Sequence, residues 1–330
     1  MVKSGGYILK SRIYDMLIKI WNSEQIPEEW TEGICPIYKK GDRRECSNYR
    51  PITLLNVVYK IFAILLHNRL CKMVEHKIGE YQTGFRPNRS TIDNIFIIRQ
   101  IYEKCHEYNI ELHNVFVDFM HAFDSVNRSL ISECLKQYEV PKKLTNLTQS
   151  TLQQTKAKVK INNNMTEKFE ITSGVKQGDP LSALLFSIVM DVIITKLDVR
   201  GNISTRLKQI SAYADIVIIG RTKQAMIDML NKLKNKASKY GLLINENNMK
   251  YMKCTRRQYR ENKIEIKVMS FESVQSFKYL GSTVNQNNTT EEEIKGRLIA
   301  GNKAYYANQK MFQSKLLSRK SKLKLYWTLI

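Results

Sequence analysis

Two aspartates that are far apart in the sequence stand where a carboxylate could do chemistry. Asp118 lies in Val115–Phe119, where β-branched and aromatic residues alternate as in a buried strand. An unpaired buried charge is costly, so a carboxylate at the end of such a strand is expected to have a partner, and Asp118 is therefore a candidate metal ligand. Asp215 lies in a turn between the apolar runs of Ile210–Gly220, a pattern that predicts a hairpin. Two acids on neighbouring strands of one sheet could hold Mg²⁺, which takes oxygen ligands and commonly shares them with substrate phosphates.

The composition indicates a globular protein with a polyanionic partner. Its 330 residues, with 43% hydrophobic and 25% charged, are enough for two or three subdomains around a real core. Lys and Arg outnumber Asp and Glu by 53 to 31, which gives a net charge of +22 that is spread along the whole sequence. Such a field favours nucleic acid as the partner, and a protein that is merely rich in lysine is the alternative.

The cysteines and histidines do not form a metal-binding pattern. The 6 Cys contain no CxxC pair, so a zinc ribbon is excluded and a reduced, intracellular setting is expected. The 5 His have no ligand spacing. The sequence has no apolar run that would span a bilayer and no signal-peptide pattern at its N-terminus. We therefore expect a protein of the cytoplasm or nucleus, without a membrane partner, that is not secreted.

Hydrophobic periodicity predicts an α+β fold, with helices and β-hairpins along the whole chain. Predicted helices cover residues 7–21, 57–74, 91–108, 129–138, 181–197, 223–240 and 290–312. Predicted strands, besides the two that carry the acids, cover residues 33–42 with a basic turn at the end, 156–161, 264–268 and 277–284. Helices combined with a sheet that brings two acids together indicate a palm-like arrangement.

Several short blocks are informative through their order along the chain. They are Tyr49–Ile52, Gly84–Ser90, Phe116–Val126, Gly174–Ser182, Tyr213–Asp215, Gly241–Glu246 and Phe277–Ser282. Together they resemble the motifs of the reverse transcriptase domain of a non-LTR (LINE-type) retrotransposon. The resemblance covers nearly the whole chain, from about Trp30 to Ile330.

This resemblance implies an RNA-directed DNA polymerase with a right-hand fold and an antiparallel palm sheet. Residues 1–110 would form an N-terminal extension and the fingers, residues 111–284 the palm with a finger insertion at about 129–165, and residues 285–330 the start of a truncated thumb. The partners would be an RNA template, a DNA primer, the RNA–DNA hybrid and dNTP. Two Mg²⁺ ions would be the cofactors, held ~3.5–4 Å apart so that the attacking and leaving oxygens are both stabilised.

The resemblance also assigns roles to residues of the palm. Asp118 and Asp215 would be catalytic metal ligands, and the backbone of Phe119 could add a carbonyl ligand. Phe123 would screen the sugar 2′ position, where its bulky ring would exclude a ribonucleotide. An ordinary core aromatic is the alternative for Phe123.

A second group of palm residues surrounds the loop Gly174–Pro180. By resemblance, Gln177 would lie against the incoming nucleotide. Gly174 and Gly178 fit a loop whose backbone approaches a ligand closely. Asp124 fits either a metal ligand or a helix cap for the residues after it, and we favour the cap.

Basic residues in other blocks would contact phosphate. Lys39 and Arg50 lie on a predicted hairpin that would close over the triphosphate, and a solvated basic loop is the alternative. Arg86 and Arg89 suit contact with the template backbone, because phosphate contacts position a nucleic acid without reading its sequence. By resemblance, further nucleic-acid contacts would come from Lys278, Tyr279 and Gly281.

The chain departs from the family pattern in two blocks. The family usually has two adjacent acids at the hairpin turn, whereas here Asp215 is followed directly by Ile216. The loss of one turn residue should shift the strand register and weaken the second metal site. The family also tends to carry a lysine shortly after Asn245–Glu246, where this chain has Asn247–Met249 before Lys250.

Three classes of function follow from these observations. The first is an RNA-directed DNA polymerase, and the second is a catalytically decayed copy that acts only as a nucleic-acid-binding protein. The third is a scaffold that binds another protein, and the net charge of +22 argues against it.

Overall fold

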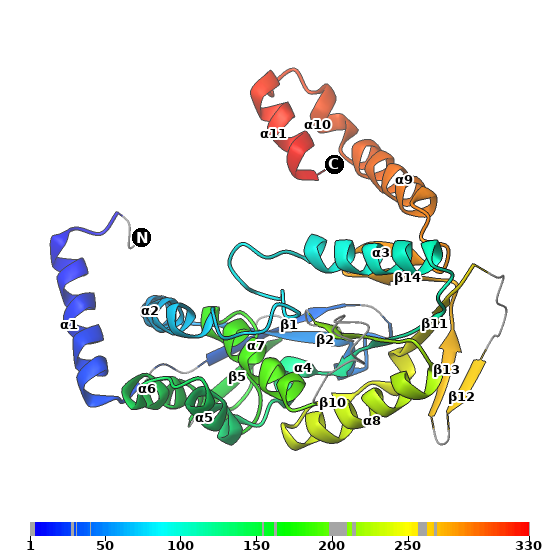
Figure 1. The fold of residues 1–330 in the computed structure, drawn as a ribbon. Helices are drawn as coiled ribbons and strands as arrows, with labels where there is room; N and C mark the ends of the chain where they lie inside the picture. The colour runs from blue at the N-terminus through cyan, green and yellow to red at the C-terminus, as the bar shows by residue number, and fades with distance from the viewer. Residues whose placement is uncertain are drawn as a thin grey trace. The chain divides into compact units, whose positions relative to one another are not determined.

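The computed structural model describes residues 4–27, 30, 32–39, 41–153, 155–161, 164–197, 210–212, 216–256, 263–266 and 269–329. The chain forms two compact units, and Figure 1 labels many of their helices and strands. The first unit consists of Met1–Asn94 and Val115–Met249, and the second of Ile95–Asn114 and Lys250–Ile330. Helices and sheets occur in both units, as the predicted α+β class requires. The predicted division into fingers, palm and thumb stays a prediction.

One sheet of the first unit combines strands from distant parts of the chain. β1 (Glu32–Tyr38) and β2 (Tyr49–Leu54) form an antiparallel hairpin, and β5 (Thr155–Ile161) runs parallel to β1. The short strands β6 (Asn164–Met165) and β7 (Phe169–Ile171) both pair with β5.

A second sheet places the first predicted acid. In β3 (Leu112–Val117), residues 115–117 belong to the first unit and lie next to β9 (Ile216–Gly220). β9 is apolar and buried throughout, as is typical of a strand covered on both faces, and pairs antiparallel with β8 (Ile210–Ala212). β4 (Phe119–Met120) follows β3 and pairs with β10 (Leu243–Ile244), so Asp118 stands between two strands with different partners.

The helix α7 (Pro180–Thr195) forms the centre of the first unit's core, and nearly all of its side chains from Leu181 to Ile194 are buried. Its start is set by Asp179, which caps the helix by accepting a 2.9 Å hydrogen bond from the backbone N–H of Leu181. Pro180 occupies the first turn, where a missing N–H costs nothing. The helix α2 (Val57–Val74) packs against α7. The other helices of this unit are α1 (Tyr7–Ser23), α4 (Ala122–Ser125), α5 (Arg128–Gln137), α6 (Lys142–Leu152) and α8 (Lys223–Lys239), with 3₁₀ turns η1 (Cys46–Asn48) and η2 (Glu246–Asn248).

The second unit is built on the helix α3 (Thr91–Glu107), of which residues 95–107 belong to it. Arg99 of α3 donates a 3.1 Å hydrogen bond to the Thr283 carbonyl, and a His106 ring nitrogen lies 2.9 Å from the Gln286 carbonyl. These bonds fasten α3 to the hairpin of β14 (Ser276–Tyr279) and β15 (Ser282–Asn285). The remaining elements are β11 (Lys250–Cys254), β12 (Lys263–Ile266), β13 (Met269–Ser273), α9 (Glu291–Ala307), α10 (Gln309–Gln313) and α11 (Arg319–Leu329).

Most predicted helices are confirmed, and the long buried helix α6 is one that the periodicity did not predict, as are α4 and α11. Helix α6 begins after Pro141, where the predicted helix 129–138 was expected to stop, and is rich in threonine, which is a weak helix former. Thr145, Thr148 and Thr151 are nevertheless buried with the leucines of the same face, so packing overrides local preference. Within the described residues, no helix is both long and apolar enough to cross a membrane.

Candidate functional site

Asp118 is held at the junction of β3 and β4 by the segment that follows β10. The Phe119–Ile244 pairing of β4 with β10 brings this segment alongside. The backbone N–H of Asn245 donates to the Asp118 carbonyl at 2.9 Å, and the Asn248 side-chain amide donates to Asp118 Oδ2 at 2.8 Å. The Asp118 carboxylate is half-buried, which leaves part of it accessible to a ligand.

The predicted partner of Asp118 lies outside the described residues. The register Ala212–Ile216 between β8 and β9 leaves residues 213–215, which include Asp215, between the strands. No group of three or more His, Cys, Asp or Glu side chains that could hold a metal ion occurs among the residues that the structure describes. The predicted approach of Asp118 to Asp215, and the metal contact of the Phe119 carbonyl, stay predictions.

Asp124 does not cap a helix, and this preference from the sequence was wrong. It lies inside the short helix α4, and both oxygens of its carboxylate accept hydrogen bonds from Gln177 Nε2, at 3.0 and 2.9 Å. The cap of the next helix, α5, is Asn127, whose side chain accepts from the Ser129 N–H at 3.1 Å. Gln177 therefore positions α4 against the loop that precedes α7.

Burial raises the pKa of Asp124 above its usual value. The hydrogen bonds from Gln177 oppose this effect most, and smaller electrostatic contributions from His121 and Lys39 also oppose it. The Lys39 and Arg50 side chains are exposed, as a contact with triphosphate requires.

The loop 174–180 fits against α4 through its backbone. Gly174 has φ +78°, and a Cβ added there would lie 2.4 Å from the Asp124 carbonyl oxygen, so only glycine fits. The N–H groups of Gly174 and Val175 donate to the carbonyls of Val126 and Phe123 at 2.8 and 2.7 Å. The close approach expected of Gly174 is thus to the protein's own backbone.

Phe123 is clamped between two aromatic rings. It stacks on Phe186 of α7, with ring centroids 4.8 Å apart, and meets the edge of Phe85 at 6.0 Å. The ring is half-buried, so it is fixed in position and part of it remains accessible to a ligand. This geometry suits a steric screen, and the role at the sugar 2′ position stays a prediction.

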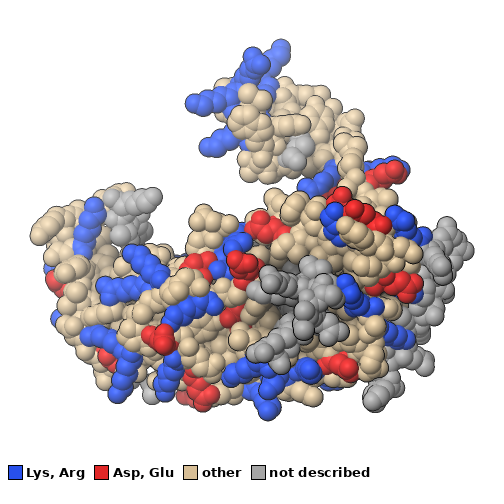
Figure 2. Space-filling view, in the orientation of Figure 1, with Lys and Arg blue, Asp and Glu red and all other residues tan. Residues whose placement is uncertain are grey.

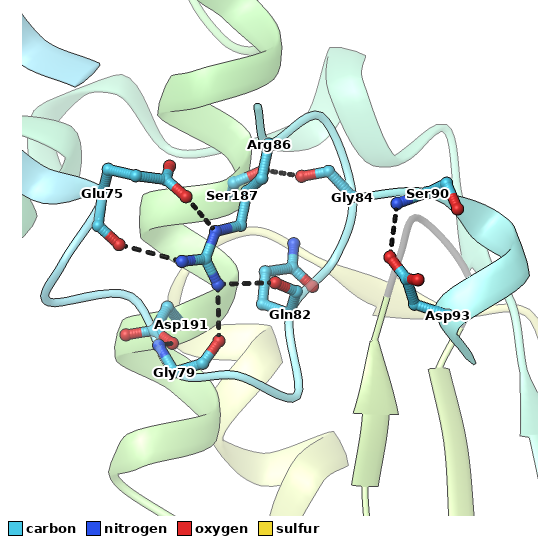
Figure 3. A network of polar contacts seen from close by, with 9 residues as sticks. All are labelled: Glu75, Gly79, Gln82, Gly84, Arg86, Ser90, Asp93, Ser187 and Asp191. Carbon is cyan, nitrogen blue, oxygen red and sulfur yellow. Dashed lines mark hydrogen bonds and ion pairs between the residues drawn. The ribbon is translucent and has the colours of Figure 1, made fainter. Parts of the chain in front are cut away.

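Arg86 holds a loop together, as Figure 3 shows. Its Nε lies 2.9 Å from a Glu75 carboxylate oxygen, and its Nη atoms donate at 2.8–2.9 Å to the carbonyls of Glu75, Gly79 and Gln82. The residue is only 9% exposed. Contact with a template phosphate would require these bonds to break, so the structure argues against that role for Arg86. Arg89 is exposed, and its contact with a template phosphate stays a prediction.

The three residues proposed on the β14–β15 hairpin differ in exposure. Lys278 and Gly281 are exposed, and Gly281 has φ +89° in the two-residue turn. Tyr279 is only 1% exposed and belongs to the core of its unit. A direct nucleic-acid contact by the Tyr279 ring is therefore excluded in this conformation, because alternate side chains of a strand point to opposite faces and this one points inward.

Sequence reasoning also missed a polar contact of the site. It recognised the block Gly241–Glu246 without assigning it a task, and the structure shows Asn245 and Asn248 as hydrogen-bond donors to Asp118. A short polar segment straight after the strand β10 was the available signal. Its partner could not be read from the sequence because it lies more than a hundred residues away.

Comparisons with known proteins agree with the motif pattern. A family model described as "Reverse transcriptase (RNA-dependent DNA polymerase)" matches residues 37–284. The transposon TX1 uncharacterized 149 kDa protein of Xenopus laevis is 30% identical over 197 residues, which are 58% of this chain and 15% of that protein. The Pol polyprotein of the type-2 retrotransposable element R2DM of Drosophila melanogaster is 27% identical over 201 residues, 60% of this chain and 19% of that protein. The matches thus span about a fifth or less of these relatives.

Solved structures show the same fold. Apo telomerase from Candida tropicalis superposes with a TM-score of 0.58 and 14% identity over 96% of this chain and 57% of that one. The structure of the same telomerase with the TWJ fragment of telomeric RNA gives a TM-score of 0.56, over 96% of this chain and 56% of that one. At this identity the likeness concerns the fold alone, and it confirms the predicted right-hand polymerase fold.

The two loop arginines should respond differently to substitution. We expect Arg86→Ala to lower the free energy of unfolding by about 3 kcal/mol, because it leaves several buried carbonyls and Glu75 without their donor. Arg89→Ala should leave stability unchanged and weaken RNA binding for all sequences alike. Urea unfolding and filter binding test this. An Arg86→Ala protein of normal stability with lost RNA affinity would contradict it.

The raised pKa of Asp124 predicts a pH effect on stability. Because the folded state disfavours the ionised form, the contribution of Asp124 is fully present at acid pH and is lost as pH rises through its folded pKa. Asp124→Asn should remove this term, so the variant should gain stability relative to the original chain on going from acid to neutral pH. Thermal unfolding at both pH values measures the difference, and parallel pH profiles would refute it.

Proposed function

Because this chain belongs to the reverse transcriptase family, we propose that it is the RNA-directed DNA polymerase domain of a non-LTR retroelement. In this reaction a primer 3′-OH on an RNA template attacks a dNTP and releases pyrophosphate. The observation that carries the proposal is the half-buried Asp118 at the end of β3, whose main chain and side chain are both fixed by the segment after β10. The motif blocks around it support the assignment.

The residues present fit a hard divalent cation in part. Asp118 offers a carboxylate that is half-exposed and bonded to a neutral amide, which suits oxygen coordination of Mg²⁺. In this proposal Asp118 and Asp215, with the Phe119 carbonyl, would hold two Mg²⁺ ions. Such ions, when bound, would stabilise the attacking and leaving oxygens of the displacement.

The other residues of the site would bind and orient the substrates. Phe123, fixed by Phe186, would exclude a 2′-OH through its position. Gln177 would form the rigid wall beside the nucleotide, since its amide is already bonded to Asp124. The exposed Lys39 and Arg50 would neutralise the triphosphate.

The nucleic-acid partners would be held by exposed basic residues. The RNA template and the RNA–DNA hybrid would contact Arg89, Lys278 and the backbone at Gly281. Figure 2 shows further Lys and Arg side chains gathered over α11, where Arg319, Lys320 and Lys324 are exposed. Such contacts position a duplex without reading its sequence. We place this reaction inside the cell, in the cytoplasm or nucleus.

Binding to RNA and to RNA–DNA hybrid should depend strongly on salt. A net charge of +22 favours contacts to several phosphates, each of which releases counterions, so the logarithm of the affinity should fall linearly with the logarithm of salt concentration. Fluorescence anisotropy with a labelled hybrid between about 50 and 200 mM salt measures the slope, where a loss of about 10³-fold or more is expected for six or more contacts. A flat salt profile would favour a small-molecule or protein partner.

Primer extension by the chain should be slow. With Ile216 directly after Asp215, the turn lacks one acid, and Mg²⁺ tolerates a defective oxygen site poorly. Inserting Asp between these residues should raise the extension rate at least about 10-fold at saturating Mg²⁺, while hybrid binding stays unchanged. Equal rates for both chains would show that the second acid is dispensable here. Hybrid binding without extension by either chain would indicate the decayed, binding-only copy.

A further inference from the structure

Among the described residues, the Asp118 carboxylate accepts a hydrogen bond from the side chain of Asn248, which ends the 3₁₀ turn η2. The turn is closed by a 3.1 Å hydrogen bond from the Asn248 N–H to the Asn245 carbonyl. Asn245 in turn donates to the Asp118 carbonyl at 2.9 Å. One segment of four residues therefore fixes both the main chain of Asp118 and, through the Asn248 amide at 2.8 Å, its carboxylate.

The same turn is anchored from its outer side. Lys234 of α8 forms an ion pair with Glu246 at 2.6 Å, and Met249, directly after the turn, is only 1% exposed. Since the ion pair is exposed, it adds little energy, whereas the buried methionine holds the end of the turn in the core. Asn248 itself is exposed, so its side chain can rotate while the backbone stays in place.

A carboxamide carries a donor and an acceptor on one planar group. In the structure the nitrogen of Asn248 donates to Asp118. Half a turn of the amide about its last side-chain bond exchanges nitrogen for oxygen. Asparagine carbonyl oxygens are regular ligands of hard divalent cations, as carboxylate oxygens are. A cation bound by Asp118 would repel the N–H₂ group and attract the oxygen.

We propose that Asn248 is a ligand for a divalent cation that Asp118 binds, and that its amide holds the carboxylate ready before the cation arrives. This inference deepens the proposed function, on which it rests for the role of Asp118. Within the described part of the chain, the proposed site then has two side-chain ligands, the Asp118 carboxylate and the neutral amide oxygen of Asn248. The site accordingly takes Mg²⁺ or Mn²⁺ with lower affinity than two carboxylates would give.

Cation binding by the full chain, without nucleic acid, tests the proposal. Mn²⁺ binding is measured by electron paramagnetic resonance for the original chain, Asn248→Asp, Asn248→Ala and Asn247→Asp. Asn248→Asp should bind Mn²⁺ about 10-fold more tightly and Asn248→Ala about 10-fold more weakly, the size usual for groups that support a metal ligand. Asn247→Asp places the same charge on the same exposed turn and should change the affinity by less than about 2-fold.

The outcomes separate this inference from the proposed function. Unchanged Mn²⁺ affinity in Asn248→Ala, or equal gains from Asn248→Asp and Asn247→Asp, overturns the role of Asn248, even when primers are extended. The expected order of affinities supports it, even when no variant extends a primer, and then the polymerase assignment alone fails. Each variant must be folded at the temperature of the binding measurement, which its thermal unfolding curve shows. Because Asn248→Asp keeps the side-chain shape, it provides a reading should Asn248→Ala unfold.

Discussion

The double hydrogen bond from the Gln177 amide to the Asp124 carboxylate is the interaction on which the site depends. It joins α4, which directly follows the Asp118 strand, to the loop that starts α7. The same loop is fixed from two other directions, by the backbone contact at Gly174 and by the bond from the Thr53 N–H to the Gln177 carbonyl. Three segments far apart in the sequence are thereby held in one arrangement, although the interaction costs a partly buried charge.

The sequence predicted those features that depend on local pattern. Helices with a strong apolar period, such as α2 and α7, were placed almost to the residue, and the Asp118 strand was recognised from its alternation. The features that were missed depend on side-chain partners that a periodic pattern does not reveal. Arg86 looked like a phosphate ligand until its partners, the carbonyls of its own loop, were known. Tyr279 likewise could not be assigned to the core, because a tyrosine suits either face of a strand.

The hairpin after Ala212 shows how the fold persists although the turn is one residue shorter than the family pattern. A one-residue slip normally exposes a strand's apolar face, and this penalty fixes the register. In β9, however, Ile216–Ile219 are apolar and no more than 7% exposed on both faces, so either register buries similar surface. The sheet therefore keeps its buried surface whether or not the turn carries a second acid. A likeness of fold therefore does not by itself show that a complete set of metal ligands is present.

The side chain beside the Asp118 carboxylate is a neutral amide, that of Asn248. Two carboxylates that share one site repel each other until a cation binds, which destabilises the empty protein. With an amide as the neighbour, Asp118 has a hydrogen-bonded partner in the absence of metal, and the empty site is stable. In the proposed site, the attraction for a cation would be weaker than that of two carboxylates, because an amide oxygen carries only a partial charge. Under the proposed function, nucleic-acid binding would not depend on a cation at this site, because exposed basic residues would carry it, whereas the rate of primer extension would depend on the cation.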